Sequence, residues 1–242
     1  MNTKTHKIIV SGIEVHVVRK AIKNLHLGVY PPAGRVRVAA PLVVSDSAVR
    51  LAIIGKLGWI KRQQARFHEQ QRQSAREMVS GESHYFLGRR YRLRVFEHDE
   101  TNKIILRNNA SLELHIRPKT DVKRREQVLH LWYREQLKIL IPPLMEKWRT
   151  ITGVRVTDWR IKKMMTKWGS FSKDARRIWV NLELAKKPVE CLEYIIVHEM
   201  MHFIEPHHNE RFHALMDQYI PKWDLRRAEL NRAPLGHEKW EY

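Results

Sequence analysis

Apolar and polar residues alternate through the first forty positions, which is the pattern of half-buried β-strands. The alternating runs between residues 7 and 41 are KIIV, IEVHVV, LHLGVY and RVRVAAP. The last two runs flank PPAG, residues 31–34, and a Pro-Gly turn between two alternating runs predicts a β-hairpin.

A helical period replaces this alternation after residue 44. Ser45 or Asp46 is suited to be the N-cap, and apolar residues then recur at positions 49, 53, 57 and 60. Residues 81–118 return to short alternating runs, which predict three or four strands with a turn at RNNAS, residues 107–111.

The following segment predicts one long helix and two strands. Residues 121–149 have helical periodicity, and Pro142 and Pro143 are expected to kink or divide that helix. Residues 154–172 and 176–184 predict two strands joined by a turn.

The C-terminal segment is predicted to be helical. A helix begins at Pro188 and continues until Pro206 stops it. Two short helices follow, at about 208–219 and 223–231, and no internal repeat is visible along the chain.

These elements together predict an α+β fold in two parts. Residues 1–120 form a β-rich part with one helical segment, and residues 121–242 form a mixed part. A chain of 242 residues can bury one core or two smaller ones, and its 43% hydrophobic residues and eight tryptophans argue against a disordered protein.

Cysteine usage and the apolar runs indicate the compartment. The single cysteine, Cys191, excludes an internal disulfide framework and a cysteine-based zinc ribbon, and it fits a reducing environment. The first twenty residues lack the apolar run and cleavage site of a secretory signal, and nowhere do ~18 consecutive apolar residues occur. We therefore expect a cytoplasmic protein without a membrane segment.

The net charge points to an anionic partner. Forty-five Lys and Arg residues against 26 Asp and Glu residues give +19, and such an excess attracts nucleic acid or another phosphate-bearing molecule. The basic runs KRQQAR, RRYRLR, KRR and KK would contact phosphates without reading bases. The alternative is that these runs are ordinary solvated surface.

The strongest chemical signal is HEMMH, residues 198–202. His198 and His202 are one helical turn apart on the same face, so both imidazoles can reach one metal ion, and Glu199 is near enough to take a proton from water. Because the surrounding YIIVHEMMHF is strongly apolar, burying these polar groups is costly unless their polar atoms bind a metal or form hydrogen bonds. The alternative is a histidine pair that is hydrogen-bonded within the core.

A catalytic zinc needs a third protein ligand and an open position. Pro206 ends the helix and lets the chain turn back, so His208 is the expected third ligand, in HExxH-x5-H spacing. Glu229 is the fallback if the site uses two histidines and a glutamate, and His213 is either a cleft or a surface residue. A site with only nitrogen ligands favours Zn²⁺ over magnesium or calcium.

Other residues are candidates for supporting roles that spacing alone leaves open. Hydrogen-bond partners of the metal-binding imidazoles could come from Glu205, Glu210 or Asp217. Candidates for charge stabilisation during the reaction are Lys167, Tyr194 and His213.

A strand next to the zinc helix could bind the substrate. The stretch Lys167, Trp168, Gly169 and Ser170 is predicted to offer backbone groups to which an extended peptide adds as another strand. Gly169 would let the substrate backbone approach closely, or it is a turn glycine beside a core tryptophan.

Several stretches resemble the YgjP-like zinc metallopeptidases, which are related to SprT-like proteases. They are KWGSFS, IWVNLELAKKPVECLEYIIVHEMMHF, HHNERF, IPKWDLRRAEL and the N-terminal segment from VVRKAIKNLHLGVY to LGWI. The resemblance implies a zincin-like catalytic part in residues 121–242, with the HExxH helix packed on a small sheet. It also implies zinc ligands His198, His202 and His208 and the base Glu199. This chain has Phe171 where the family usually has Cys, and His213 where an aromatic residue is frequent.

Three functions follow from these observations. The first is hydrolysis of peptide bonds, in which zinc polarises the scissile carbonyl and Glu199 carries a proton from water to the leaving amine. SprT-like relatives suggest protein substrates on or near DNA. The second is zinc-dependent hydrolysis of an anionic small molecule such as a nucleoside triphosphate, although no Gly-rich phosphate loop is present. The third is a non-catalytic nucleic-acid-binding protein, for which Glu199 would have no use.

Overall fold

The protein folds into two compact units. The structure, a computed structural model, describes residues 4–30, 33–69, 76–108, 110–164 and 167–232. Described residues before position 70 form the first unit and those after position 75 form the second, and each unit has its own buried core. The three small sheets and six α-helices of the described residues confirm the α+β class.

The boundary between the units differs from the division expected near residue 120. That position falls inside the second unit, because strands before it and the helix after it share one buried cluster. Leu93 and Leu112 from the strands and Leu129 and Leu137 from the helix all belong to that cluster.

The first unit is a four-stranded sheet with two helices on one side. Its elements are β1 (Lys4–Val10), β2 (Ile13–Lys20), β3 (His26–Tyr30), β4 (Arg35–Pro41), α1 (Asp46–Ile54) and α2 (Leu57–Glu69). The strand order is β1-β2-β4-β3, and β2 and β4 are parallel. Valines of β2 and β4 pack against Val49 and Ile53 of α1 and Ile60 of α2.

Two local predictions for this unit are confirmed. Strands β3 and β4 form the expected antiparallel hairpin, whose Pro31 and Pro32 lie outside the described residues. Ser45 is the N-cap of α1, because its side chain accepts a hydrogen bond from the backbone N–H of Ala48.

The second unit contains two sheets and four α-helices. Its elements are β5 (Ser83–Phe86), β6 (Arg89–Glu97), β7 (Lys103–Arg107), β8 (Ser111–Ile116), α3 (Val122–Thr152), β9 (Asp158–Lys162), β10 (Gly169–Ser172), β11 (Arg177–Asn181), the 3₁₀ helix η1 (Leu182–Lys186), α4 (Val189–Met201), α5 (Glu210–Tyr219) and α6 (Trp223–Arg232). None of the helices in the described part of the chain is long and apolar enough to cross a membrane.

The first sheet of this unit repeats the topology of the N-terminal sheet. Its strand order is β5-β6-β8-β7, with β6 and β8 parallel and the outer pairs antiparallel, as in β1-β2-β4-β3. The first hairpin of each sheet also turns through two residues with positive φ, Ser11-Gly12 and Leu87-Gly88. The sequence did not reveal this repeat, because the shared feature is the turn and pairing pattern rather than the residue types.

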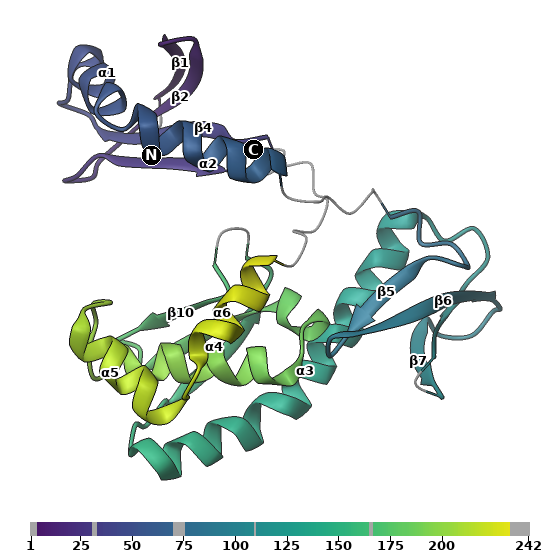
Figure 1. Cartoon of the computed structure of the whole chain (residues 1–242). Helices are drawn as coiled ribbons and strands as arrows, with labels where there is room; N and C mark the ends of the chain where they lie inside the picture. Colours follow the sequence, from purple (N-terminus) through teal and green to yellow (C-terminus); the bar gives the residue numbers. More distant parts are fainter. Residues whose placement is uncertain (1–3, 31–32, 70–75, 109, 165–166, 233–242) are drawn as a thin grey trace. The chain divides into compact units, whose positions relative to one another are not determined.

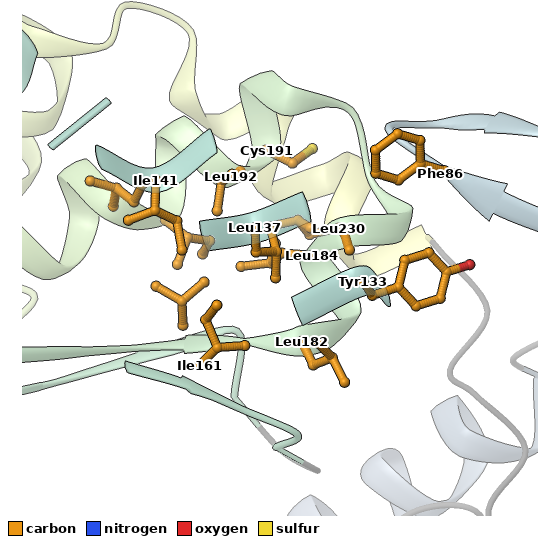
Figure 2. Packing of buried hydrophobic residues seen from close by; sticks show 14 of the residues in the cluster. Phe86, Tyr133, Leu137, Ile141, Ile161, Leu182, Leu184, Cys191, Leu192 and Leu230 are labelled. Carbon is orange, nitrogen blue, oxygen red and sulfur yellow. The ribbon is translucent and has the colours of Figure 1, made fainter. Parts of the chain in front are cut away.

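Helix α3 contributes many of the core residues of the second unit. It continues for 31 residues through Pro142 and Pro143, so these prolines do not divide it as one prediction allowed. Residues at helical spacing on one face of α3, such as Tyr133, Leu137 and Ile141, pack against residues from α4 and η1 (Figure 2). The hydroxyl of Tyr133 donates a hydrogen bond of 2.6 Å to the Tyr85 carbonyl, so this buried polar atom is satisfied.

The last sheet corrects the strand predicted over residues 154–172. That stretch forms two strands, β9 and β10, which lie on opposite sides of β11. Strand β9 runs parallel to β11, so the chain must cross over before β10 pairs antiparallel with the other edge. As expected for the HExxH helix, α4 packs against a small sheet: it contacts β10 and β11 and lies next to α3 (Figure 1).

Helix α4 ends earlier than predicted. Its last residue is Met201 and His202 is the C-cap, whereas Pro206 was expected to stop it. The N–H groups of Phe203 and Ile204 donate to carbonyls three residues back, at Met200 and Met201. The helix therefore tightens into a final turn before the proline is reached.

Candidate active site

The predicted site is built on α4, the most deeply buried of the described helices. Nine residues of α4 are buried, including Ile195, Val197 and Met201, so the helix has no solvent-facing stripe of the usual width. His198 and Glu199 of α4 and its C-cap His202 are therefore polar groups in an apolar environment. Glu199 is 6% exposed and His202 is 5% exposed.

The structure brings the three predicted ligands together. One nitrogen atom from each of His198, His202 and His208 can be chosen so that all three lie within 4.8 Å of one another. The Nε2 atoms of His198 and His208 are 3.0 Å apart. Such closely grouped imidazole nitrogens, from two separate segments, could hold a metal ion.

A backbone contact fixes the orientation of His202. Its Nδ1 lies 3.2 Å from the Glu205 carbonyl oxygen, which can only accept a hydrogen bond. The proton of the neutral ring is therefore on Nδ1, and Nε2 keeps a lone pair for a ligand. Among the proposed partners, Glu205 thus contributes through its backbone, and its carboxylate accepts from the N–H of His207.

Burial favours the neutral form of all three imidazoles. Burial, with the charges of His202 and His208, lowers the pKa of His198 to about 3. Burial also lowers the pKa of His202 and of His208. In addition, Nδ1 of His198 is buried without a hydrogen-bond partner among the described residues. Neutral imidazoles with available lone pairs fit a metal ion, and three nitrogen donors suit zinc.

His208 reaches the cluster because of the next helix. Asn209, which follows it, is the N-cap of α5 and accepts a hydrogen bond of 3.0 Å from the Phe212 N–H. This cap holds the start of α5 beside the end of α4. His207 is exposed and does not belong to the cluster.

Two phenylalanines hold the imidazole rings. His202 is stacked on Phe171 and on Phe212, with centroids 4.9 and 4.7 Å away, and so lies between them. Phe212 also contacts His198 and His208 edge to face, at 5.0 and 4.7 Å. It is 1% exposed and touches all three rings. Sequence analysis missed both roles, because an aromatic residue in an apolar strand or helix is usually only a core residue.

Glu199, the predicted base, is buried in α4 directly after His198. Burial raises its pKa to about 8, while the positive charge of Lys167 acts in the opposite direction. The backbone of Gly169 lies against it: a Cβ at Gly169 would be 2.6 Å from Oε1 of Glu199 and 2.8 Å from Cγ2 of Ile195. The small size of Gly169 therefore makes room for Glu199, a role that differs from the predicted close approach of substrate.

The rest of the predicted substrate strand lies at the sheet edge. Ser170 belongs to β10, which pairs only with β11 among the described strands. Trp168 is partly buried against the core, and the Lys187 ammonium lies 5.6 Å from its ring centroid. Lys167 is exposed.

Asn181, which sequence analysis did not select, holds this strand in place. It is 3% exposed and its Nδ2 donates to the carbonyls of Met164 and Lys167, at 2.8 and 2.7 Å. Its Oδ1 accepts from the N–H groups of Met164 and Glu183. All four hydrogen-bonding positions of the amide are used, which fixes the segment that leads into β10.

Tyr194 and His213, two candidates for charge stabilisation, lie next to Trp223 of α6. His213 stacks on Trp223 at 5.5 Å, Trp223 stacks on Tyr194 at 6.3 Å, and Tyr194 meets His198 edge to face. Arg227, not selected from sequence, adds a positive charge that lowers the pKa of both His198 and His208.

Three other carboxylates were proposed as ligands or partners. Glu229, the fallback ligand, accepts a hydrogen bond of 3.5 Å from Cys191, at the other end of α4. Asp217 accepts from the indole N–H of Trp223 at 2.8 Å. Glu210 is exposed in the first turn of α5. None of the three belongs to the cluster that could hold a metal in the described part of the chain.

Comparison with known proteins identifies the family. A search of curated proteins found no match. Residues 23–233 match the family described as YgjP-like, metallopeptidase domain. The matched stretch includes the three clustered histidines, Glu199 and β10. The chain therefore belongs to the YgjP-like family, and its matched region is a metallopeptidase domain.

Proposed function

We propose that the protein is a zinc-dependent, zincin-like peptidase in which His198, His202 and His208 hold the metal and Glu199 is the general base. The observation that carries this proposal is the cluster of three neutral imidazoles next to a buried carboxylate. Three protein ligands leave a fourth position open, as in catalytic zinc sites. A bound zinc ion would supply a Lewis acid that makes water acidic near pH 7.

Glu199 would move the proton. It takes a proton from the attacking water and delivers it to the leaving amine nitrogen, so that the peptide bond can break. Burial, opposed by the charge of Lys167, brings the pKa of Glu199 to about 8, so this carboxylate can both take up and release a proton at a pH near neutral. A group that can do both near neutral pH suits this role.

The substrate would bind as an additional strand along β10. This strand has one neighbour, β11, among the described strands, so its other edge can pair with an extended peptide. Lys167, Trp168, Gly169 and Ser170 would lie along the bound chain, with His213 on the other side of the site. Lys167, Tyr194 and His213 remain the candidates for stabilising the negative charge that develops on the carbonyl oxygen.

We also propose that the enzyme acts near nucleic acid. The support is the net charge of +19. Two of the basic runs already make internal contacts: Arg125 donates to backbone carbonyls and Lys186 pairs with Glu183 at 2.7 Å. Part of KRQQAR is outside the described side chains, and the arginines of RRYRLR are exposed.

The test compares zinc-loaded wild type with Glu199→Gln. Both proteins are incubated with an unfolded protein substrate, with and without single-stranded DNA, and the products are identified by peptide mass. We expect cleavage by wild type only, with zinc content equal in both proteins. Equal cleavage by Glu199→Gln would reject its role as the base. Hydrolysis of nucleoside triphosphates but not peptides would support the small-molecule alternative instead.

A further inference from the structure

One face of the sheet β5-β6-β8-β7 is open, basic and aromatic, and we infer that it binds single-stranded nucleic acid. We call it the arginine face and define it by Tyr85, Arg90, Arg92, Arg94 and Phe96, which all lie on β5 or β6. The inference rests on the proposed association with nucleic acid and locates it on the molecule. It does not depend on the proposed hydrolysis of peptides.

The two faces of this sheet differ in burial. Alternate residues of its strands, among them Tyr91, Leu93 and Leu112, are buried towards α3. The residues between them on β6, Arg90, Arg92 and Arg94, are exposed. Because side chains alternate across a strand, these three guanidinium groups belong to the face that the core does not use.

The described residues do not neutralise the positive charge of this face. Arg90, Arg92 and Arg94 form no ion pair with any residue that the structure describes. The one carboxylate on the neighbouring β8 positions is Glu113, which already binds Arg107 and His115 at 3.2 and 3.4 Å. Residues two apart on a strand are about 6.6 Å apart, so the arginines form a linear row of charges that suits an extended phosphate backbone.

Exposed aromatic rings lie at both ends of the arginine row. Tyr85 on β5 pairs with Arg90 and is 38% exposed, and Phe96 follows Arg94 by two residues and is 37% exposed. Phe96 is stacked on His115 with centroids 5.2 Å apart, and the Arg94 guanidinium is 5.6 Å from its centroid. These contacts hold the ring in place on the surface.

Rows of cations interleaved with aromatic rings are characteristic of surfaces that bind single strands. The cations contact phosphates and unstacked bases pack on the rings. A duplex keeps its bases stacked internally, so Tyr85 and Phe96 would add nothing to its binding. An acidic protein could form ion pairs with the arginines, but it would not supply planar bases that stack on Tyr85 and Phe96. Single-stranded DNA or RNA is therefore the occupant that uses both features.

The test uses the full-length protein and fluorescence anisotropy. The probes are a labelled DNA oligonucleotide, an RNA of the same sequence and the DNA duplex, with heparin as a competitor. The triple variant Arg90→Gln, Arg92→Gln, Arg94→Gln is compared with Lys138→Gln, Lys147→Gln, Arg149→Gln, which removes the same charge from exposed positions of α3. Circular dichroism checks that both variants keep the fold.

We expect the arginine triple variant to bind a single strand at least about tenfold more weakly, and its salt slope to fall by about 2. The α3 variant should change affinity less than about threefold. Phe96→Leu should weaken binding about fivefold or more without changing the salt slope, because it removes stacking rather than charge. A comparison of the DNA and RNA probes shows which strand is preferred, and either preference supports the inference.

Four results would overturn the inference. Equal losses in both triple variants would mean that binding follows total charge and not this face. Tighter binding of the duplex, or unchanged binding by Phe96→Leu, would remove the role of stacking. Absence of binding by wild type would also remove the proposed association with nucleic acid. The peptide-hydrolysis assay is separate, so none of these results bears on the proposed peptidase activity.

Discussion

The Cα of Gly169 faces the Glu199 side chain so closely that a methyl group there would lie 2.6 Å from Oε1 and 2.8 Å from Cγ. Gly169 lies on β10 and Glu199 on α4, so this contact sets how near α4 can approach the sheet. Gly169 does not have a positive φ. The need for glycine at this position is therefore one of space and not of backbone conformation.

This contact predicts the effect of Gly169→Ala. The new methyl group must displace the Glu199 carboxylate, so we expect kcat to fall about 100-fold, the effect of misplacing a reacting group by roughly 1 Å. Zinc affinity should change much less, because no imidazole is touched. The control is Gly58→Ala, whose methyl group would meet only Arg62 at 3.5 Å. Unchanged kcat in Gly169→Ala would show that Glu199 has room to move without loss.

Adjacent histidines provide a test of the third ligand. We expect His208→Ala to weaken zinc binding at least about 100-fold, because loss of one of three ligands should weaken zinc binding more than loss of a residue that only orients a ligand. His207→Ala should change it less than about threefold, because His207 lies outside the cluster. Affinity is measured by competition with a chromophoric chelator. Similar losses in both variants would indicate that the loop as a whole, and not the His208 imidazole, matters.

The stacking of Phe171 on His202 predicts that this ring positions the ligand. Phe171→Leu should weaken zinc binding about tenfold, the lower range for residues that orient a metal ligand. It should also change the visible absorption of the cobalt-substituted protein. Phe96→Leu is a matched control, because Phe96 is stacked on His115 at a similar distance and angle, away from the cluster. Phe171→Tyr retains the ring and should restore most of the affinity.

The four hydrogen bonds of Asn181 predict a large loss of stability in Asn181→Ala. Two backbone N–H groups and two backbone carbonyls lose their side-chain partner in a buried site. We expect the free energy of unfolding to fall by about 2–4 kcal/mol, measured by urea denaturation. Asn24→Ala, at an exposed position, should change it by less than about 0.5 kcal/mol.

His130 predicts how stability depends on pH. Burial, helped by the charges of Lys163 and Lys186, lowers the pKa of His130 to about 4 from an ordinary value of 6.5. The folded state therefore favours the neutral ring. Its contribution to stability is complete above pH 6.5 and is lost as the pH falls from 6.5 towards about 4.

Urea denaturation of metal-free protein at pH 7 and pH 5 measures this effect. His130→Gln should lose less stability between these two values than wild type does, because it has no proton to bind on unfolding. The slope for one such proton cannot exceed about 1.4 kcal/mol per pH unit. The control, His26→Gln, replaces an exposed histidine and should follow wild type. Parallel curves for all three proteins would contradict the prediction.

Local features of the fold were predicted well from the sequence. The hairpin of β3 and β4, the N-cap at Ser45 and the helices α5 and α6 all depend on residues close together in the chain. The prediction failed where pairing with a segment distant in the sequence determines the structure. The chain between β9 and β10 crosses over because the two strands pair with opposite edges of β11. The apolar pattern of residues 154–172 carries no information about this pairing.

The candidate site divides in the same way. His198, Glu199 and His202 are brought together by helical spacing, since backbone hydrogen bonds fix residues four apart on one face. Their grouping was therefore determined by the sequence. The same spacing left His208 and Glu229 as alternatives, and it gave no sign that Phe212 touches all three imidazoles.

The sequence by itself thus determined the helix that carries HExxH, the net charge and the membership of an α+β class. The tertiary structure decided that His208 joins the cluster, that Glu229 lies at Cys191, and that Gly169 leaves room for Glu199. The physical reason is the range of the forces involved. Helical and strand periods follow from hydrogen bonds and side-chain directions within a few residues, whereas these contacts depend on how α4, α5 and β10 pack around a shared core.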